Sequence, residues 1–225
     1  MNQNLYKKIA VLDIDGTLIA GQIQQGLINY FYAKGKLSTM YVIRLNLWFV
    51  MYKLHITNNI KGIFEFGLKY LKDKSVHEID SIVSRYVEEK VKQKVFHGSF
   101  GLIKKLREEG YVIILLSTAV DVVVSKIAEL FQVDDYICTK LERVHDCYTG
   151  RISGDIAYGE RKINLLKDYL SSRSYSLADV RAYADHESDI PLLKIVGKAY
   201  IANPDIKMER LSKMLNIDTI NLQKQ

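Results

Sequence analysis

The sequence predicts an α/β fold in which a three-layer core with a mostly parallel sheet carries an inserted, all-helical domain. Two continuously apolar runs, Ile9–Leu12 and Tyr111–Leu116, are typical of strands buried on both faces of a parallel sheet. Between residues 19 and 93 only helical spacing of apolar residues is found. From Ser99 onward, helix and strand patterns alternate, as they do when helices cover a parallel sheet. We therefore expect a discontinuous core of residues 1–18 and 94–225 and a helical insertion of residues 19–93.

The insertion is expected to contain four helices. In the first, apolar residues recur at the three- and four-residue spacing of one helix face, and Gly35 ends the pattern. The last opens with Ser75-x-x-Glu78, the pattern of a capping box. The expected ranges are Gln22–Lys34, Met40–Ile56, Asn59–Leu71 and Ser75–Lys92.

The second of these ranges, Met40–Ile56, is the most apolar part of the chain, but Arg44, Asn46 and Lys53 interrupt it. A membrane span needs about 20 apolar residues with few charges, so no transmembrane span is expected. Three interpretations remain open. The segment is a helix packed within the insertion, an apolar lid over a substrate, or a contact with a membrane surface or a lipid phosphate.

After the insertion, the core is expected to alternate helices with strands. Gly110 marks the end of one helix, and Pro191 the start of another. The expected helices are Phe100–Glu109, Asp121–Phe131, Gly159–Ser171, a helix begun by Pro191, and one ending near Leu215. The expected strands are Tyr111–Leu116, Asp135–Leu141 with a hairpin around Val144–Cys147, Val180–Ala184, Lys198–Ala202 and Thr219–Leu222.

Composition limits the class of protein. A hydrophobic content of 48% in 225 residues suffices for a packed core. The net charge of +6 suits a phosphorylated partner, but the Lys and Arg residues are scattered, so we expect no nucleic-acid partner. Cys138 and Cys147 fit neither a disulfide scaffold nor a zinc site and are expected to be free thiols. Only four consecutive apolar residues precede Asp13, too few for a signal peptide, so we expect a cytoplasmic protein.

Two carboxylates follow the first strand directly. Asp13 and Asp15 are two residues apart, so extended backbone projects them to the same side, at the strand end where open α/β sheets bind ligands. Two carboxylates this close repel each other unless a cation, or separate acid and base roles, relieves the repulsion. Gly16 allows a tight turn, and Thr17 adds a hydroxyl. Taken alone, this run also fits an ordinary turn.

Further polar residues stand at three later element ends. Ser117 and Thr118 follow the second buried strand, where a hydroxyl and backbone N–H groups can bind an anion. Lys162 falls in the first turn of a helix, where the helix dipole disfavours a cation unless an anion is near. Asp185 and Asp189 flank the turn after a later strand. Taken singly, each cluster also fits a common turn or a solvated side chain.

Together and in this order, the four clusters resemble the motifs of the haloacid dehalogenase-like (HAD) phosphatases. The matching residues are Asp13-Ile-Asp15-Gly16-Thr17 for the first motif, Leu116-Ser117 for the second, Lys162 for the third, and Asp185 with Asp189 for the fourth. The resemblance covers nearly the whole chain and implies a Rossmann-like core. The helical insertion then looks like the C1 cap of the phosphoserine-phosphatase-like branch, subfamily IB.

The resemblance and the chemistry of the residues suggest the same roles. An ionised Asp13 can attack phosphorus to give an aspartyl-phosphate, while Asp15 protonates the leaving oxygen and later deprotonates water. The resemblance implies Mg²⁺ as the cofactor, and oxygen donors suit that ion. The residues implied in metal binding are Asp13, Asp15 through its backbone carbonyl, Asp185 and Asp189. Those implied in phosphate binding are Ser117, Thr118, Lys162 and Ser188.

One specificity position departs from the family pattern. Phosphoserine phosphatases carry a Glu nine residues beyond the nucleophile that binds the substrate ammonium, and this chain has Gln22 there. A neutral amide cannot form that ion pair, so we expect a Mg²⁺-dependent phosphomonoester hydrolase acting on a small phosphorylated metabolite other than phosphoserine. Two alternatives stay open: a phosphotransferase to an acceptor other than water, and a non-catalytic protein that binds a phosphorylated ligand or a membrane surface.

Overall fold

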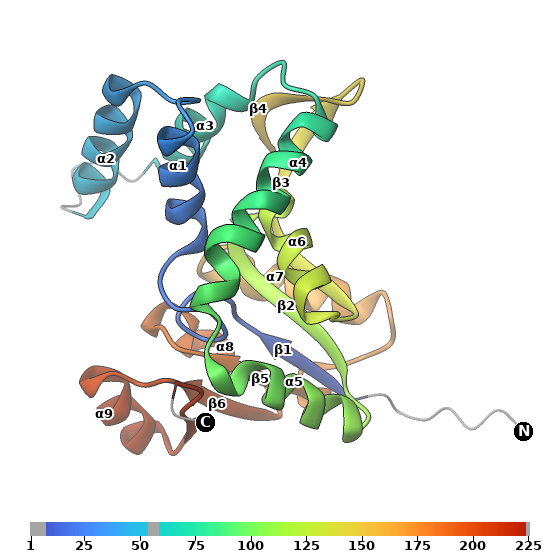
Figure 1. Ribbon diagram of the computed structural model, residues 1–225. Coiled ribbons are helices and arrows are strands. Elements are labelled where there is room, and N and C mark those ends of the chain that lie inside the picture. The colour runs from blue at the N-terminus through green and yellow to red at the C-terminus, as the bar shows by residue number, and fades with distance from the viewer. Residues whose placement is uncertain (1–7, 54–58, 224–225) are drawn as a thin grey trace, which may run out of the picture.

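A computed structural model describes residues 8–53 and 59–223 and confirms the expected α/β fold. In these ranges one sheet has the strand order β4-β3-β2-β1-β5-β6-β7, and every neighbouring pair is parallel except β3 with β4 (Figure 1). The strands are β1 Ile9–Leu12, β2 Val112–Val120, β3 Asp135–Val144, β4 Cys147–Ser153, β5 Val180–Ala184, β6 Lys198–Ala202 and β7 Asp218–Ile220.

The helices follow the expected order. They are α1 Ile23–Ala33, α2 Thr39–Lys53, α3 Ile60–Leu68, α4 Val76–Tyr86, α5 His97–Glu108, α6 Asp121–Phe131, α7 Glu160–Ser171, α8 Ile190–Leu193 and α9 Ile206–Leu215. A π turn, Val87–Val91, continues α4, and a 3₁₀ turn, Lys69–Leu71, continues α3. The expected end of the second insertion helix, residues 54–56, lies outside the described ranges. No helix within those ranges is long and apolar enough to cross a membrane.

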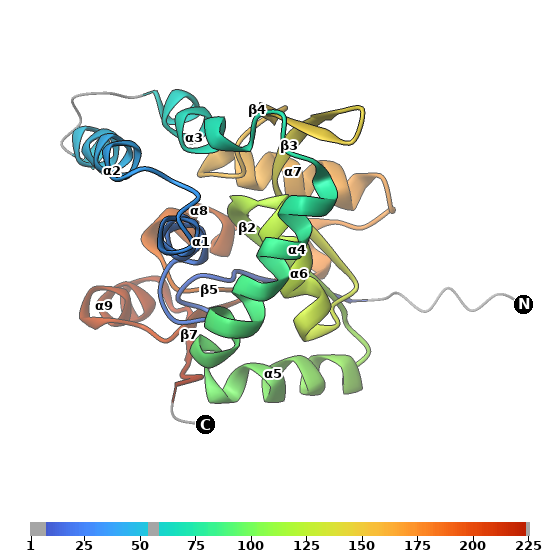
Figure 2. The ribbon, with the colours of Figure 1, turned by 45° about the horizontal axis from the view of Figure 1, so that its top comes forward.

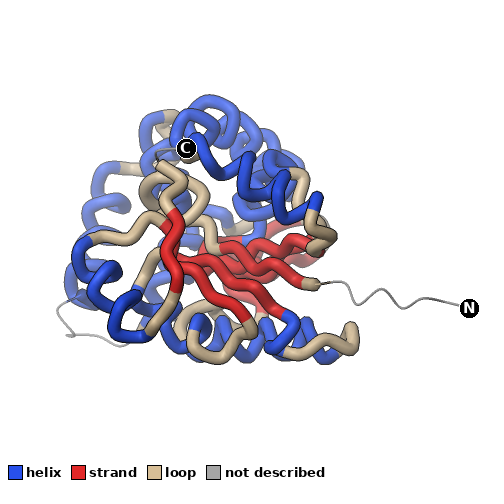
Figure 3. The backbone as a smooth tube through the Cα atoms, turned by 90° about the horizontal axis from the view of Figure 1, so that it is seen from below, coloured by secondary structure: helices blue, strands red, loops and turns tan. Residues whose placement is uncertain are grey.

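The sheet is buried on both faces, as the continuous apolar runs predicted. Successive residues of β1 point to opposite sides, so that Ala10 and Leu12 pack with α5 and α6 while Ile9 and Val11 pack with α7, α8 and α9. Figure 3 shows the strands as one layer with helices on either side. This arrangement is the three-layer core.

Strand β2 differs from its expected form. The strand was expected to end at Leu116, but it continues to Val120, and its pairing with β3 is irregular between these two residues. A bulge of this kind bends the strand and redirects its side chains. Ser117 and Thr118 therefore lie within a distorted strand end and not in the turn that follows it.

The insertion has two parts in space. Helices α1, α2 and α3 stand above the carboxyl edge of the sheet, whereas α4 runs down beside α6 (Figures 1 and 2). Ser75 caps α4 by accepting a hydrogen bond from the Glu78 N–H at 3.1 Å, which is one of the two hydrogen bonds of the predicted capping box. Buried side chains of the insertion and of the core belong to one continuous cluster. The boundaries at residues 18/19 and 93/94 stay a prediction.

Candidate active site

The carboxyl ends of three adjacent strands bring three of the four motifs together. Strand β1 pairs in parallel with β2 on one side and with β5 on the other, and Leu12 lies opposite both Leu115 and Tyr183. Asp13 therefore leaves the sheet between the ends of β2 and β5. In open α/β sheets this edge is where ligands bind.

Lys162 joins this edge from the first turn of α7. Its side chain is buried, with 4% of the residue exposed, so it is not the solvated lysine that a single-residue interpretation favours. The ammonium donates to Asp13 Oδ1 and to Asp189 Oδ1, both at 2.8 Å. One buried cation thus links the first, third and fourth motifs.

The protonation states reflect this crowding. Burial would by itself lower the pKa of Lys162, but the charges and hydrogen bonds of Asp13 and Asp189 raise it, so Lys162 stays charged. Burial, with the charges of Asp189 and Asp185, raises the pKa of Asp13, and the Lys162 ammonium opposes that rise. More carboxylates than cations share this site, which is therefore short of positive charge.

Asp15 faces the start of the insertion. Its Oδ1 accepts a hydrogen bond from the backbone N–H of Ile23, the first residue of α1, at 2.8 Å. Burial raises the pKa of Asp15 to about 6, even though this hydrogen bond favours the ionised form. A carboxyl group with such a pKa exchanges protons readily near neutral pH.

Asp185 is locked against the loop of the first motif. Its Oδ1 accepts from the Thr17 hydroxyl at 3.1 Å. Gly16 has a φ of +74°, and a Cβ there would lie 1.9 Å from Asp185 Oδ2, so no other residue fits this loop without moving the carboxylate. Burial raises the pKa of Asp185, while the Thr17 hydrogen bond opposes the rise.

The hydroxyl residues take different positions. Ser117 is buried, and its Oγ accepts from the Ala119 N–H at 3.2 Å, which leaves the hydroxyl proton available to a ligand. The Thr118 hydroxyl donates to the Ala157 carbonyl at 2.9 Å and so ties β2 to the loop before α7. Ser188 is half-buried, with its Oγ 2.9 Å from His186 Nδ1. Phosphate binding by these hydroxyls remains a prediction.

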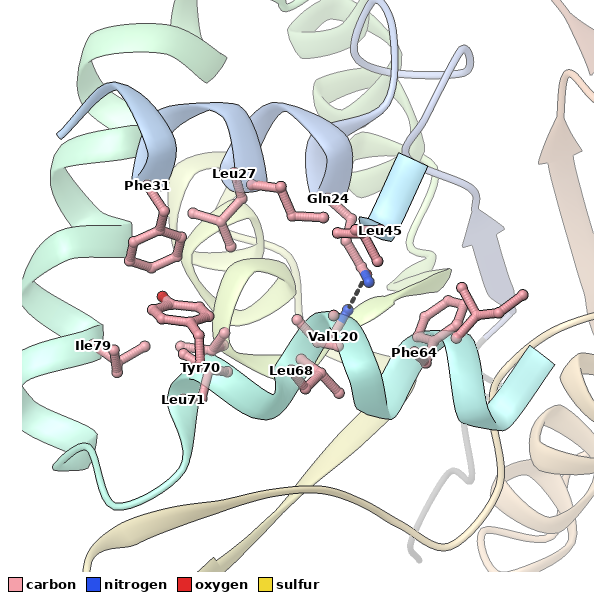
Figure 4. A pocket seen from close by; sticks show the side chains of 14 residues that line it. Gln24, Leu27, Phe31, Leu45, Phe64, Leu68, Tyr70, Leu71, Ile79 and Val120 are labelled. Carbon is pink, nitrogen blue, oxygen red and sulfur yellow. Dashed lines mark hydrogen bonds between the residues drawn. The ribbon is translucent and has the colours of Figure 1, made fainter. Parts of the chain in front are cut away.

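Gln22 and Gln24, at the start of α1, have different surroundings, and the specificity role of Gln22 stays a prediction. Gln22 is exposed at the start of α1, whereas Gln24 Oε1 accepts from the Val120 N–H at 3.2 Å (Figure 4). Gln24 also lines a cavity of about 30 Å³ between the insertion and the core. The partner of Gln24 is a backbone N–H group, so the sequence carries no signal for this contact.

Asn203 was also missed as a residue that shapes the site. Its Nδ2 donates to the Gly16 carbonyl at 2.8 Å and to the Thr17 carbonyl at 3.0 Å. Its Oδ1 accepts from the Leu222 N–H at 2.7 Å. The side chain thus ties the loop of the first motif to the chain beyond β7. Asn203 has a left-handed φ of +45°, and no pattern in the sequence indicates that conformation.

The donor set fits a hard divalent cation. Within the described ranges, no three or more His, Cys, Asp or Glu side chains are grouped so as to hold a metal by themselves. Mg²⁺ does not require such a group, because it keeps several waters and takes only one or two protein carboxylates. Asp13 and Asp185 offer two such carboxylates, and the charge of Asp185 raises the pKa of both Asp13 and Asp15, as expected where positive charge is lacking.

Known proteins share both the sequence pattern and the fold. Relatives include a histidinol-phosphatase of Neisseria meningitidis, 24% identical over 96% of this chain and 100% of its own length. Another is a phosphoserine phosphatase of Mycobacterium tuberculosis, 24% identical over 91% of this chain and 67% of its own length.

Among solved structures, a protein of unknown function from Bordetella pertussis superposes with a TM-score of 0.86 at 21% identity, covering 96% of this chain and 99% of that one. A phosphoserine phosphatase carrying a phospho-aspartyl intermediate analogue gives 0.64 at 19% identity, covering 97% and 94%. Both likenesses concern the fold.

The family model of haloacid dehalogenase-like hydrolases matches residues 10–194, which include all four motifs. The chain therefore belongs to the haloacid dehalogenase-like hydrolase family, as its motifs predicted.

Proposed function

We propose that this hydrolase is a Mg²⁺-dependent phosphomonoesterase that acts through an aspartyl-phosphate on a small phosphorylated metabolite. The observation that carries the proposal is the buried Lys162 ammonium, 2.8 Å from both Asp13 and Asp189. A fixed cation beside a carboxylate nucleophile can offset the charge of a phosphoryl group during transfer. Relatives named as phosphatases support phosphate esters as the substrate class.

The chain's own side chains can carry both chemical steps. An Asp13 carboxylate oxygen bonds to phosphorus as the bond to the leaving oxygen breaks, and Asp15 gives its proton to that oxygen. Asp15 then takes a proton from water, whose oxygen displaces Asp13 and releases inorganic phosphate. The Asp15 pKa of about 6 suits both transfers, because each form is populated near neutral pH. Lys162 and the Ser117 hydroxyl hold the phosphoryl oxygens.

Asp13, Asp185 and the backbone carbonyl of Asp15 would hold Mg²⁺, with Asp189 contacting its water shell. When bound, the ion supplies positive charge to the phosphoryl oxygens. Lys162 alone does not balance the surrounding carboxylates, which is why we include the metal in the proposal.

The substrate proposed is a metabolite other than phosphoserine. Gln22 is neutral and exposed, so it offers no charge to a substrate ammonium. We also propose the cytoplasm as the location, which the free thiols of Cys138 and Cys147 support.

Asp13→Asn tests this proposal. Removing the nucleophile is expected to lower the release of phosphate from p-nitrophenyl phosphate by about 10³-fold or more. A chelator should abolish turnover by the unmodified protein, and added Mg²⁺ should restore it. Asp73→Asn is the matched control, because Asp73 is exposed and its φ of +63° suits Asn equally well. Undiminished turnover by Asp13→Asn, or indifference to the chelator, would refute the mechanism.

A further inference from the structure

Helix α2 has an apolar inner face that belongs to the insertion. Leu45 is 1% exposed and lines the cavity above the core. The rings of Tyr41 and Trp48 stack on Phe66 of α3, with centroids 5.2 and 5.3 Å away. These contacts cover the inner face of α2, whose residues have the spacing of one side of a helix.

The outer face of α2 is apolar as well. Met40, Ile43, Leu47 and Val50 are spaced by three, four and three residues, so they form one line along the helix, named here the α2 stripe. They are 62%, 55%, 56% and 50% exposed. The main neighbours of α2 are α1 and α3, and the helix stands at the outer edge of the molecule (Figures 1 and 2). An exposed apolar line of this length on the surface of a helix calls for a covering partner.

The excess positive charge of the chain lies in the same part of the molecule. Between Asp15 and Asp73 the sequence has seven of the chain's 32 Lys and Arg residues but only one of its 26 acids, Glu65. The remaining 25 basic and 25 acidic residues balance, so this segment accounts for the whole net charge of +6. Three exposed basic residues lie on α2 or on its neighbouring elements: Arg44 on α2 itself, Lys36 in the chain just before α2, and Lys61 in the first turn of α3.

We propose that the α2 stripe docks on an anionic lipid surface, with the basic side chains around it contacting the lipid phosphates. An exposed apolar line flanked by cations is the pattern of a helix that lies in the membrane interface. A second copy of the chain is a poorer occupant, because a two-fold contact through α2 would bring two segments of equal positive charge together. Charge therefore selects the lipid surface over self-association.

Vesicle binding tests this proposal directly. The full chain is mixed with vesicles of phosphatidylcholine alone and with vesicles that also contain phosphatidylglycerol, and the bound fraction is measured by co-sedimentation. Trp48 is the single tryptophan of the chain and lies on α2, so its fluorescence reports on this helix. We expect binding and a blue shift of the emission only with phosphatidylglycerol, and weaker binding at high salt.

Two double variants distinguish binding through the α2 stripe from non-specific adsorption to vesicles. Ile43→Glu with Leu47→Glu should weaken the partition into phosphatidylglycerol vesicles by about tenfold or more, because each change places a charge where an apolar side chain would be buried. Ile206→Glu with Met214→Glu is the matched control. These two residues of α9 are 74% and 79% exposed, and their replacement should leave binding unchanged.

Three results would overturn the proposal. They are no binding to phosphatidylglycerol vesicles, equal binding to both kinds of vesicle, and a dimer in light scattering that Ile43→Glu with Leu47→Glu dissociates. Hydrolysis of a soluble aryl phosphate should be the same in both double variants, because none of these residues belongs to the active site. Vesicle binding therefore tests the docking of α2, and hydrolysis of the aryl phosphate tests the phosphatase assignment separately.

Discussion

Gly16 holds the first and fourth motifs at their observed spacing because it has no side chain. An alanine Cβ would lie 1.9 Å from Asp185 Oδ2, so Gly16→Ala must displace the carboxylate that Thr17 holds. We expect a loss of phosphatase activity of about a hundredfold, the size of effect that a misplacement of about 1 Å produces. Steady-state kinetics with p-nitrophenyl phosphate measure it.

Gly21→Ala is the matched control. Gly21 has a φ of +81°, close to that of Gly16, but a Cβ there meets no atom within 4 Å. Both variants therefore carry the backbone strain of a left-handed alanine, about 1 kcal/mol, and only Gly16→Ala adds the collision. Equal activity in the two variants would show that the contact with Asp185 is unimportant.

The two thiols should differ sharply in reactivity. Cys138 is buried in β3, and this burial raises the pKa of its thiol to about 12, so about one thiol in 10⁴ is ionised at pH 8. Cys147, at the start of β4, is half-buried. Alkylation of the folded protein at pH 8 should modify Cys147 and leave Cys138 until denaturant is added. Peptide mass spectrometry distinguishes them, and similar rates at both residues would contradict the burial of β3.

At the scale of elements, Asn203 connects the loop of the first motif with the chain beyond β7. Asn203→Ala removes three hydrogen bonds, to Gly16, Thr17 and Leu222, and should lower the free energy of unfolding by about 2–4 kcal/mol. Activity should fall as well, because the loop that positions Asp13 and Asp15 loses its support. Urea unfolding and turnover measure the two effects.

Asn216 provides the comparison for this change. It ends α9 with a φ of +52°, so Asn216→Ala carries a similar left-handed strain. We expect it to cost about 1 kcal/mol and to leave activity unchanged. If the two variants lose the same stability and activity, the three hydrogen bonds of Asn203 do not matter to the loop.

Elements were predictable where the signal is local. Continuous apolar runs gave β1 and the first part of β2, the alternation of patterns gave α6 with its bounds, and Ser75 marked the start of α4. The bulge in β2 was not predictable, because it depends on how Leu116 and Val120 pair with another strand. The outward stripe of α2 was missed for a related reason: apolar spacing alone does not tell which face is covered.

At the scale of the whole molecule, long-range contacts decide which polar residues meet. Lys162 is 149 positions from Asp13 along the chain, yet their side chains are 2.8 Å apart. The order of the motifs predicted this meeting, since parallel strands share one carboxyl edge. Gln24 and Asn203 could not be assigned in the same way, because their partners are backbone groups, which leave no mark on the sequence. The Lys and Arg residues look scattered along the sequence, whereas their excess over Asp and Glu lies between Asp15 and Asp73.

The insertion and the core share one buried apolar cluster, so the two parts pack together as one folded unit. Within it, the central claim is that Asp13 becomes phosphorylated. Asp15→Asn should reveal this, because p-nitrophenolate leaves without an acid, whereas the attack of water on the aspartyl-phosphate loses its base.

The decisive measurement is therefore mass spectrometry of Asp15→Asn quenched in acid during turnover of p-nitrophenyl phosphate and then reduced with borohydride. Borohydride converts an aspartyl-phosphate to homoserine. We predict homoserine at position 13 in this variant and none in Asp13→Asn. An unmodified Asp13 in a variant that still releases p-nitrophenolate, or modification at another residue, would contradict the account.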